Sequence, residues 1–128
     1  MWASSPRLTL ALTACIAVLL AASQASAHAF LDHAEPKVGS EVDAAPTEIK
    51  ICFDAAITAT SSSIKVLDAN GNQVDKQDGH GNAKDKTELI VSLPALAPGT
   101  YKVEWRATCS CCAHVTNGYY KFVVKPAK

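Results

Sequence analysis

From residue 28 to the C-terminus the sequence predicts an all-β fold, an antiparallel sandwich or barrel of about seven short strands. Short segments with alternating apolar residues recur there, and turn residues such as Asn70-Gly71 and Pro98-Gly99 separate them. A period of two is typical of strands with one buried face, and regularly spaced turn signals are typical of sandwiches and barrels. No long apolar stripe with helical spacing occurs in this part of the chain.

Five strands are predicted from alternation alone. Their apolar positions are Ile49, Ile51 and Phe53; Ile64 and Val66; Leu89, Val91 and Leu93; Tyr101, Val103 and Trp105; and Tyr120, Phe122 and Val124. The segment around Trp105 has the clearest alternation, so we expect this tryptophan to lie in the core. The polar residues 75–86 predict a loop or an irregular hairpin outside the core.

Residues 1–27 have the three parts of a secretory signal peptide. Arg7 lies in a short basic region, an apolar run covers residues 8–22, and small residues lead to Ala27. The apolar run is shorter than the roughly 18–20 residues that a spanning helix needs. We therefore expect cleavage after Ala27. A lipoprotein leader with Cys15 as the acylated residue is an alternative, although the apolar run continues beyond Cys15.

Residues 28–128 suit one small domain with a single hydrophobic core. The whole chain has 12 Lys and Arg and 12 Asp and Glu residues, and loss of Arg7 leaves the mature part slightly acidic. Such a balance offers no basic field for nucleic acid or anionic lipid. We therefore expect no nucleic-acid partner and no membrane span in the mature chain.

Four cysteines remain after cleavage, in a compartment that permits disulfides. They are Cys52, Cys109, Cys111 and Cys112. Four cysteines allow three fully paired connectivities, and the sequence does not choose among them. A bridge from Cys52 to the cluster and a local bridge from Cys109 to Cys111 or Cys112 are both open, although a bridge between Cys111 and Cys112 would be strained.

Histidines suggest a metal site. Cleavage after Ala27 would make His28 the first residue, and its α-amine and ring Nδ1 could then chelate one copper ion. His114 lies on the connection before the last predicted strand, and Cys112 lies two residues earlier. In extended backbone, side chains two residues apart leave the same face, so Cys112 and His114 could bind one ion. His33 and His80 are expected to be solvated.

These residues also carry a resemblance that covers nearly all of residues 28–128. The sequence resembles the copper-resistance protein C family, the CopC-like periplasmic copper carriers, at 28–31, 35–36, 39–40, 45–46 and above all 93–106. The resemblance implies a periplasmic, non-catalytic copper-binding protein. It also implies a Greek-key sandwich, cupredoxin-like or immunoglobulin-like, with its site where the N-terminus meets the loop that holds His114. A membrane copper transporter or another periplasmic copper protein would be the partner.

In that family an Asp-x-His pair and the N-terminal histidine bind Cu(II), and a glycine follows four residues after the second histidine. His114 and Gly118 keep this spacing, whereas Cys112 stands where the aspartate is expected. The segment from Trp105 is one residue longer than the family pattern, so Cys111 is an alternative to Cys112. The resemblance thus implies His28, His114 and Cys112 as copper ligands.

A cysteine ligand would change the chemistry, because thiolates favour Cu(I) or form a strongly coloured bond with Cu(II). The only methionine is Met1 in the leader, so the mature chain has neither an axial methionine nor a methionine-rich Cu(I) site. Two or three cysteines of the cluster could instead surround Cu(I). For docking of the N-terminus, we expect Phe30 and Leu31 to be buried beside the Trp105 strand.

Two other functions remain open. Cys109 to Cys112 could serve electron transfer or thiol redox chemistry. The histidines could form the copper brace of an oxidase or monooxygenase, but the sequence has few aromatic residues for a flat substrate platform. A thiolate beside oxygen-activating copper would also be oxidised.

Overall fold

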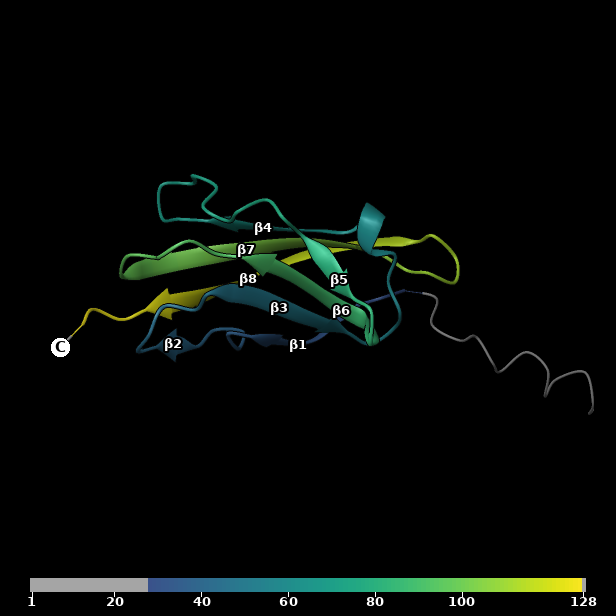
Figure 1. Cartoon of the computed structure of the whole chain (residues 1–128), viewed down its shortest axis with the longest axis horizontal. Helices are drawn as coiled ribbons and strands as arrows, with labels where there is room; N and C mark the ends of the chain where they lie inside the picture. Colours follow the sequence, from purple (N-terminus) through teal and green to yellow (C-terminus); the bar gives the residue numbers. More distant parts are fainter. Residues whose placement is uncertain (1–27, 128) are drawn as a thin grey trace, which may run out of the picture.

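The computed structural model describes residues 28–127 as two four-stranded β-sheets packed face to face (Figure 1). The first sheet has the order β1 (Leu31–Glu35), β3 (Glu48–Phe53), β6 (Asp85–Ser92), β5 (His80–Asn82). The second has the order β2 (Glu41–Val42), β8 (Val115–Val124), β7 (Gly99–Thr108), β4 (Ser63–Leu67). The predicted signal peptide, residues 1–27, lies outside the described residues.

The predicted β-sandwich is confirmed, and all five strands predicted from alternation are present. Three further strands were not predicted, for local reasons. β1 contains a bulge between Leu31 and His33 that breaks its alternation, while β2 and β5 are too short to show a period. Pairing is antiparallel except between β2 and β8, which run parallel.

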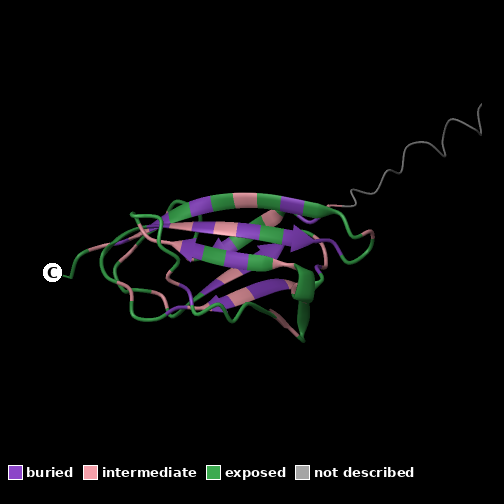
Figure 2. Ribbon diagram, turned by 90° about the horizontal axis from the view of Figure 1, so that it is seen from above, coloured by how far each residue is buried: buried purple, intermediate pink, exposed green. Residues whose placement is uncertain are grey.

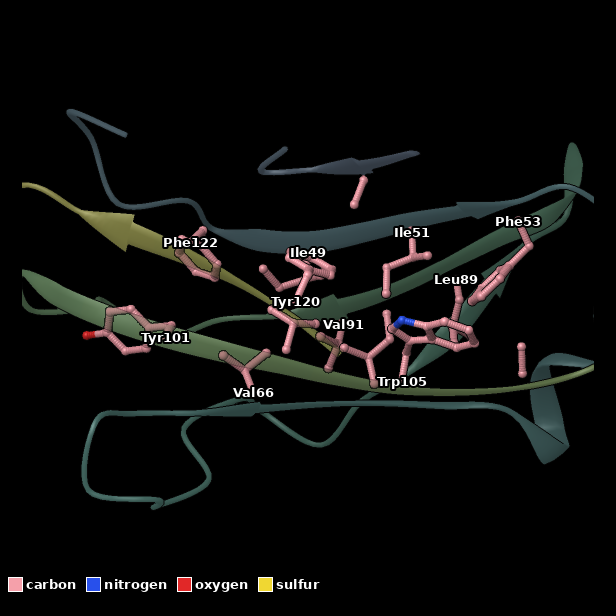
Figure 3. Close-up of a cluster of buried hydrophobic side chains, with 14 of the residues drawn as sticks. Ile49, Ile51, Phe53, Val66, Leu89, Val91, Tyr101, Trp105, Tyr120 and Phe122 are labelled. Atoms are coloured by element: carbon pink, nitrogen blue, oxygen red, sulfur yellow. The ribbon is translucent and has the colours of Figure 1, made fainter. Parts of the chain in front are cut away.

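The core lies between the sheets and is built from the inward positions of each strand (Figure 3). Burial alternates along the long strands, as Figure 2 shows. The ring of Phe53 meets the ring of Trp105 edge to face, with centroids 5.3 Å apart. Trp105 is buried, as the sequence predicts, and this ring pair joins the two sheets close to the end where the described chain begins.

The polar segment 75–86 is an irregular hairpin, as expected, but its first residue is buried. Asp75 Oδ1 accepts a hydrogen bond of 2.8 Å from the backbone N–H of Val66, and Oδ2 accepts one from the N–H of Gln77. β4 is an edge strand whose N–H groups lack a neighbouring strand on that side. The carboxylate of Asp75 fills that role, so the expectation that the whole segment lies outside the core is wrong at this residue.

The short 3₁₀ helix η1 (Ala59–Ser61) precedes β4. Within residues 28–127 there is no helix with the length and apolar character needed to cross a membrane. The hydroxyl of Ser62, just after η1, accepts a hydrogen bond from the N–H of Thr108, and the hydroxyl of Thr108 donates to the carbonyl of Ser61. These contacts hold the end of β7, where the β7–β8 connection begins.

Candidate metal centre

The two histidines singled out from the sequence lie next to each other. The centroids of the His28 and His114 rings are 4.8 Å apart, and their planes are tilted by 36°. His28 is half-buried and His114 is exposed. His114 belongs to the β7–β8 connection, which lies at the end of the sandwich where the described chain begins (Figure 1). The fold therefore brings together two imidazoles from opposite ends of the domain sequence.

Ala29 fixes the position of His28. It is fully buried, and its carbonyl accepts a hydrogen bond from the hydroxyl of the buried Thr116 on β8. The next residue is held to the other sheet, because Phe30 N–H donates to Asp54 Oδ1 at 2.8 Å and Asp54 N–H donates to the Phe30 carbonyl at 2.9 Å. Both sheets thus hold the segment that carries His28.

The expected burial of Phe30 is wrong. Its side chain is 50% exposed, whereas Leu31 is half-buried and packs against the core opposite Phe53. Consecutive side chains of an extended segment point to opposite faces, so the inward position of Leu31 turns Phe30 outward. The Phe30 ring instead stacks on the His28 ring, with centroids 6.0 Å apart. Phe30 therefore supports the histidine from outside the core.

The β7–β8 connection is a tight turn. The N–H of Ala113 donates to the carbonyl of Cys109 at 3.0 Å, and the N–H of Cys109 donates to the carbonyl of His114 at 2.9 Å. The first of these bonds closes a five-residue α-turn. Ala113 has φ of +58°, a left-handed conformation that costs a non-glycine residue roughly 1–2 kcal/mol. The conformation of this turn is therefore stabilised by its hydrogen bonds and packing, and not by the intrinsic backbone preference of Ala113.

This turn overturns the expectation that Cys112 and His114 lie in extended backbone. Cys112 lies within the turn, and the left-handed Ala113 separates it from His114. The simple rule that puts side chains i and i+2 on one face holds only for strands. The structure groups Cys112 with the other two cysteines of the turn.

The sulfur atoms of Cys109, Cys111 and Cys112 all lie within 4.8 Å of one another. Cys109 Sγ is 3.1 Å from Cys111 Sγ, which in turn is 3.6 Å from Cys112 Sγ. Cys109 is buried, Cys112 is half-buried and Cys111 is exposed. From the sequence, Cys112 is predicted as a copper ligand with Cys111 as the alternative, and the Cys-Ser-Cys-Cys spacing indicates that two or three of these cysteines could surround Cu(I). We call these three residues the sulfur cluster.

Hydrogen bonding within the sulfur cluster separates the acidities of its thiols. Hydrogen bonds from Cys111, and then from Cys112, lower the pKa of Cys109 because they stabilise its thiolate. Hydrogen bonds from Cys111 to Cys109, and then to Cys112, raise the pKa of Cys111 to about 11, since Cys111 keeps its proton as the donor. A metal ion that binds here would have to displace the remaining protons.

Cys52 is not part of the sulfur cluster. It is buried on β3 in the other sheet, and its thiol donates to Glu88 Oε2 at 3.9 Å. Burial, and then the charge of Glu88, raise the pKa of Cys52. Cys52 carries a free thiol in this structure. The four cysteines therefore divide into a group of three at the histidine end and one that pairs with a carboxylate.

The other two histidines are solvated, as expected. His33 lies on β1 with its Nδ1 2.8 Å from Asp32 Oδ2, and both side chains are exposed. His80 is exposed on β5, with its Nδ1 3.0 Å from the carbonyl of Asp78. Neither belongs to a group of three or more metal-ligating side chains among the described residues.

Two imidazoles and three thiols at one end of an eight-stranded sandwich define a small β-sandwich protein with donors for a soft or borderline metal ion. The chain belongs to the CopC domain family, whose sequence model matches residues 31–125.

Relatives and a solved structure agree with this membership. Protein YobA of Escherichia coli K12 is 35% identical over 100 residues, which cover 77% of this chain and 80% of that protein. Copper resistance protein C of Pseudomonas syringae pv. tomato is 32% identical over 113 residues, which cover 84% and 88%. The crystal structure of CopC from Methylosinus trichosporium OB3b gives a TM-score of 0.74 at 35% identity, covering 79% of this chain and 97% of that one.

Proposed function

We propose that this protein is a periplasmic copper-binding protein that holds one copper ion and passes it on, in copper resistance or homeostasis, without catalysing a reaction. Membership of the CopC domain family supports the choice of copper, since a relative that covers most of the chain is named copper resistance protein C. The partner would be a membrane copper transporter or another periplasmic copper protein.

The juxtaposition of His28 and His114 carries this proposal. Removal of residues 1–27 would leave His28 with a free α-amine beside its own imidazole and that of His114. Amine and imidazole nitrogens suit Cu(II), so the donor set fits the ion. Docking of the chain begins at the fully buried Ala29, so a chain that starts at His28 would present its amine at the site.

Cys112 would be the third ligand. It is half-buried in the turn that also holds His114, and the more exposed Cys111 is the alternative. A thiolate in this position would deepen the colour of a Cu(II) complex and stabilise Cu(I) relative to Cu(II). The oxidation state of the bound copper would then depend on the redox conditions of the periplasm.

The absence of catalysis is also part of the proposal. An oxygen-activating copper centre beside three thiols would oxidise them, first to sulfenic acid and then to sulfinic and sulfonic acids. With ascorbate as reductant, the copper-loaded protein should therefore consume oxygen no faster than the same protein without copper. Steady oxygen uptake without loss of thiols would contradict this part of the proposal.

The deciding experiment compares two forms of the protein, one that begins at His28 and one with a single glycine added in front. Cu(II) binding is followed by optical and electron paramagnetic resonance spectra. We expect the added glycine to abolish a tight one-to-one site, because it removes the α-amine chelate. A thiolate charge-transfer band that disappears in Cys112→Ser but not in Cys111→Ser would assign the third ligand. Equal binding by the two forms would refute the N-terminal site.

A further inference from the structure

We infer that the sulfur cluster is a second metal site, a three-coordinate thiolate site for Cu(I). It is built from Cys109, Cys111 and Cys112, so it shares Cys112 with the proposed N-terminal site but uses neither imidazole. The inference rests on the proposed function only for the choice of copper over other soft ions. Its geometric basis is independent, because it is the only group of three or more metal-ligating side chains that the described residues bring within 4.8 Å.

The spacing of the sulfur atoms fits a trigonal ion. With metal–sulfur bonds of about 2.3 Å, the length known for zinc thiolates, three sulfurs around one ion lie about 4 Å apart. The distances of 3.1 Å between Cys109 and Cys111 and of 3.6 Å between Cys111 and Cys112 are somewhat shorter. Small rotations of the exposed Cys111 side chain would open both distances, so the backbone need not move.

The backbone of the turn is fixed before any ion arrives. Besides its internal hydrogen bonds, Ser110 N–H donates to the carbonyl of Ala56 at 3.0 Å, and Thr58 N–H donates to the carbonyl of Thr108 at 2.8 Å. Segment 56–58 thus lies along the base of the turn and holds it on both sides of Cys109. A site whose ligands are already gathered loses little conformational entropy when the ion binds.

The number and type of donors favour Cu(I). Three thiolates form a complete shell for this soft ion, whereas closed zinc sites have four ligands. The sulfur cluster is also buried on one side and open to solvent on the other. Cys109 is 2% exposed at the inner side, while Cys111 faces solvent. An incoming ligand from a partner can therefore reach the ion at Cys111 first and take it by ligand exchange, with no change in oxidation state.

Anaerobic titration of the fully reduced protein with Cu(I), in competition with the chelator bicinchoninate, tests this inference. Hydrogen-bond partners of metal ligands are alone worth about 10- to 100-fold in affinity, so loss of a ligand should weaken Cu(I) binding by at least about 100-fold. We expect this loss in Cys111→Ser, whose exposed side chain can be changed without disturbing the core, and in Cys109→Ser. Ser110→Ala, an exposed change in the same turn, is the matched control and should bind as the wild type does.

Two further measurements separate this site from the imidazole site. X-ray absorption of the Cu(I) form should show sulfur neighbours only, and the added N-terminal glycine or His114→Ala should leave Cu(I) affinity unchanged. Conversely, Cys109→Ser should leave Cu(II) binding at His28 unchanged. The inference is wrong if Cys111→Ser binds Cu(I) like the wild type, if nitrogen dominates the absorption spectrum, or if zinc outcompetes Cu(I). If the protein that begins at His28 binds no Cu(II) tightly while its Cu(I) binding is intact, only the proposed N-terminal site is refuted.

Discussion

The hydroxyl of Thr116 donates a hydrogen bond to the buried carbonyl of Ala29, and this bond ties the start of the domain to β8. Each partner lies one or two residues from a histidine of the candidate centre. Together with the hydrogen bonds between Phe30 and Asp54, this contact positions His28 beside His114, with the ring centroids 4.8 Å apart, and contains no metal donor. The imidazole pair is held in place before copper binds.

Thr116→Val should disturb both stability and the imidazole site. The substitution keeps the shape of the side chain but leaves the carbonyl of Ala29 without its donor, which costs about 1–3 kcal/mol for a buried group. Urea unfolding should show this loss, and competition titration should show weaker Cu(II) binding. Thr116→Ser keeps the hydroxyl and is the control. Undiminished Cu(II) affinity in Thr116→Val would show that the hydrogen bond does not position His28.

Gly118→Ala should destabilise the domain by overpacking. A Cβ at this position would lie 2.5 Å from Cζ2 of Trp105, its partner across β7 and β8. Overpacking of a well-filled core typically costs about 1–3 kcal/mol. Thermal unfolding measures the loss, and a shift in tryptophan fluorescence reports the displaced ring. Gly79→Ala, where a Cβ meets nothing within 4 Å, is the matched control and should change little.

Phe30→Ala should weaken Cu(II) binding more than it lowers stability. The ring is half exposed and stacks on His28, so its loss frees the first ligand without opening a core cavity. Stability should change by no more than about 0.5 kcal/mol, as for surface positions. A ring pair contributes about 0.5–1.5 kcal/mol, so affinity should fall by up to about tenfold. Val38→Ala, at another exposed apolar residue, is the control; equal losses of stability and affinity would count against this role.

The thiols of the sulfur cluster should titrate in separate steps. Because hydrogen bonds from Cys111 lower the pKa of Cys109, the first thiolate should form below the ordinary thiol value of 9.0. Cys111 should lose its proton only near pH 11. In Cys111→Ala the pKa of Cys109 should rise, since the donor is lost. The Raman S–H band, recorded in a Cys52→Ala background, measures both steps. Simultaneous loss of all S–H intensity would contradict this order.

Cu(II) binding by the protein that begins at His28 should weaken on mild acidification. The free α-amine has an ordinary pKa of about 7.7–8.0, and its proton competes directly with the ion. Below that range, affinity should fall by about tenfold per pH unit for this one proton. Titrations between pH 6.5 and 7.5 measure the slope. A form with glycine in front should lack this contribution, and identical slopes for the two forms would argue against amine ligation.

The alternation of apolar residues was enough to predict the sandwich and strands β3, β4, β6, β7 and β8, because burial on one face imposes a period of two on the sequence itself. From the sequence, Gly118 contributed only its spacing after His114, and the structure supplies the physical reason for a glycine there, the Trp105 ring packed against it. Strands β1, β2 and β5 could not be predicted, because a bulge or two to three residues leave no period to detect.

For the candidate centre too, the sequence determined some features and the tertiary structure determined the others. Residue types and spacing were enough to single out His28, His114 and the cysteines as donors, because a side chain's metal chemistry belongs to the residue. Which donors meet was decided by contacts between distant segments. The buried Ala29, not Phe30, anchors His28, and the left-handed Ala113 groups Cys112 with Cys109. Only the tertiary structure could decide these points, because an inward or outward face and a strained backbone conformation depend on what packs against the segment.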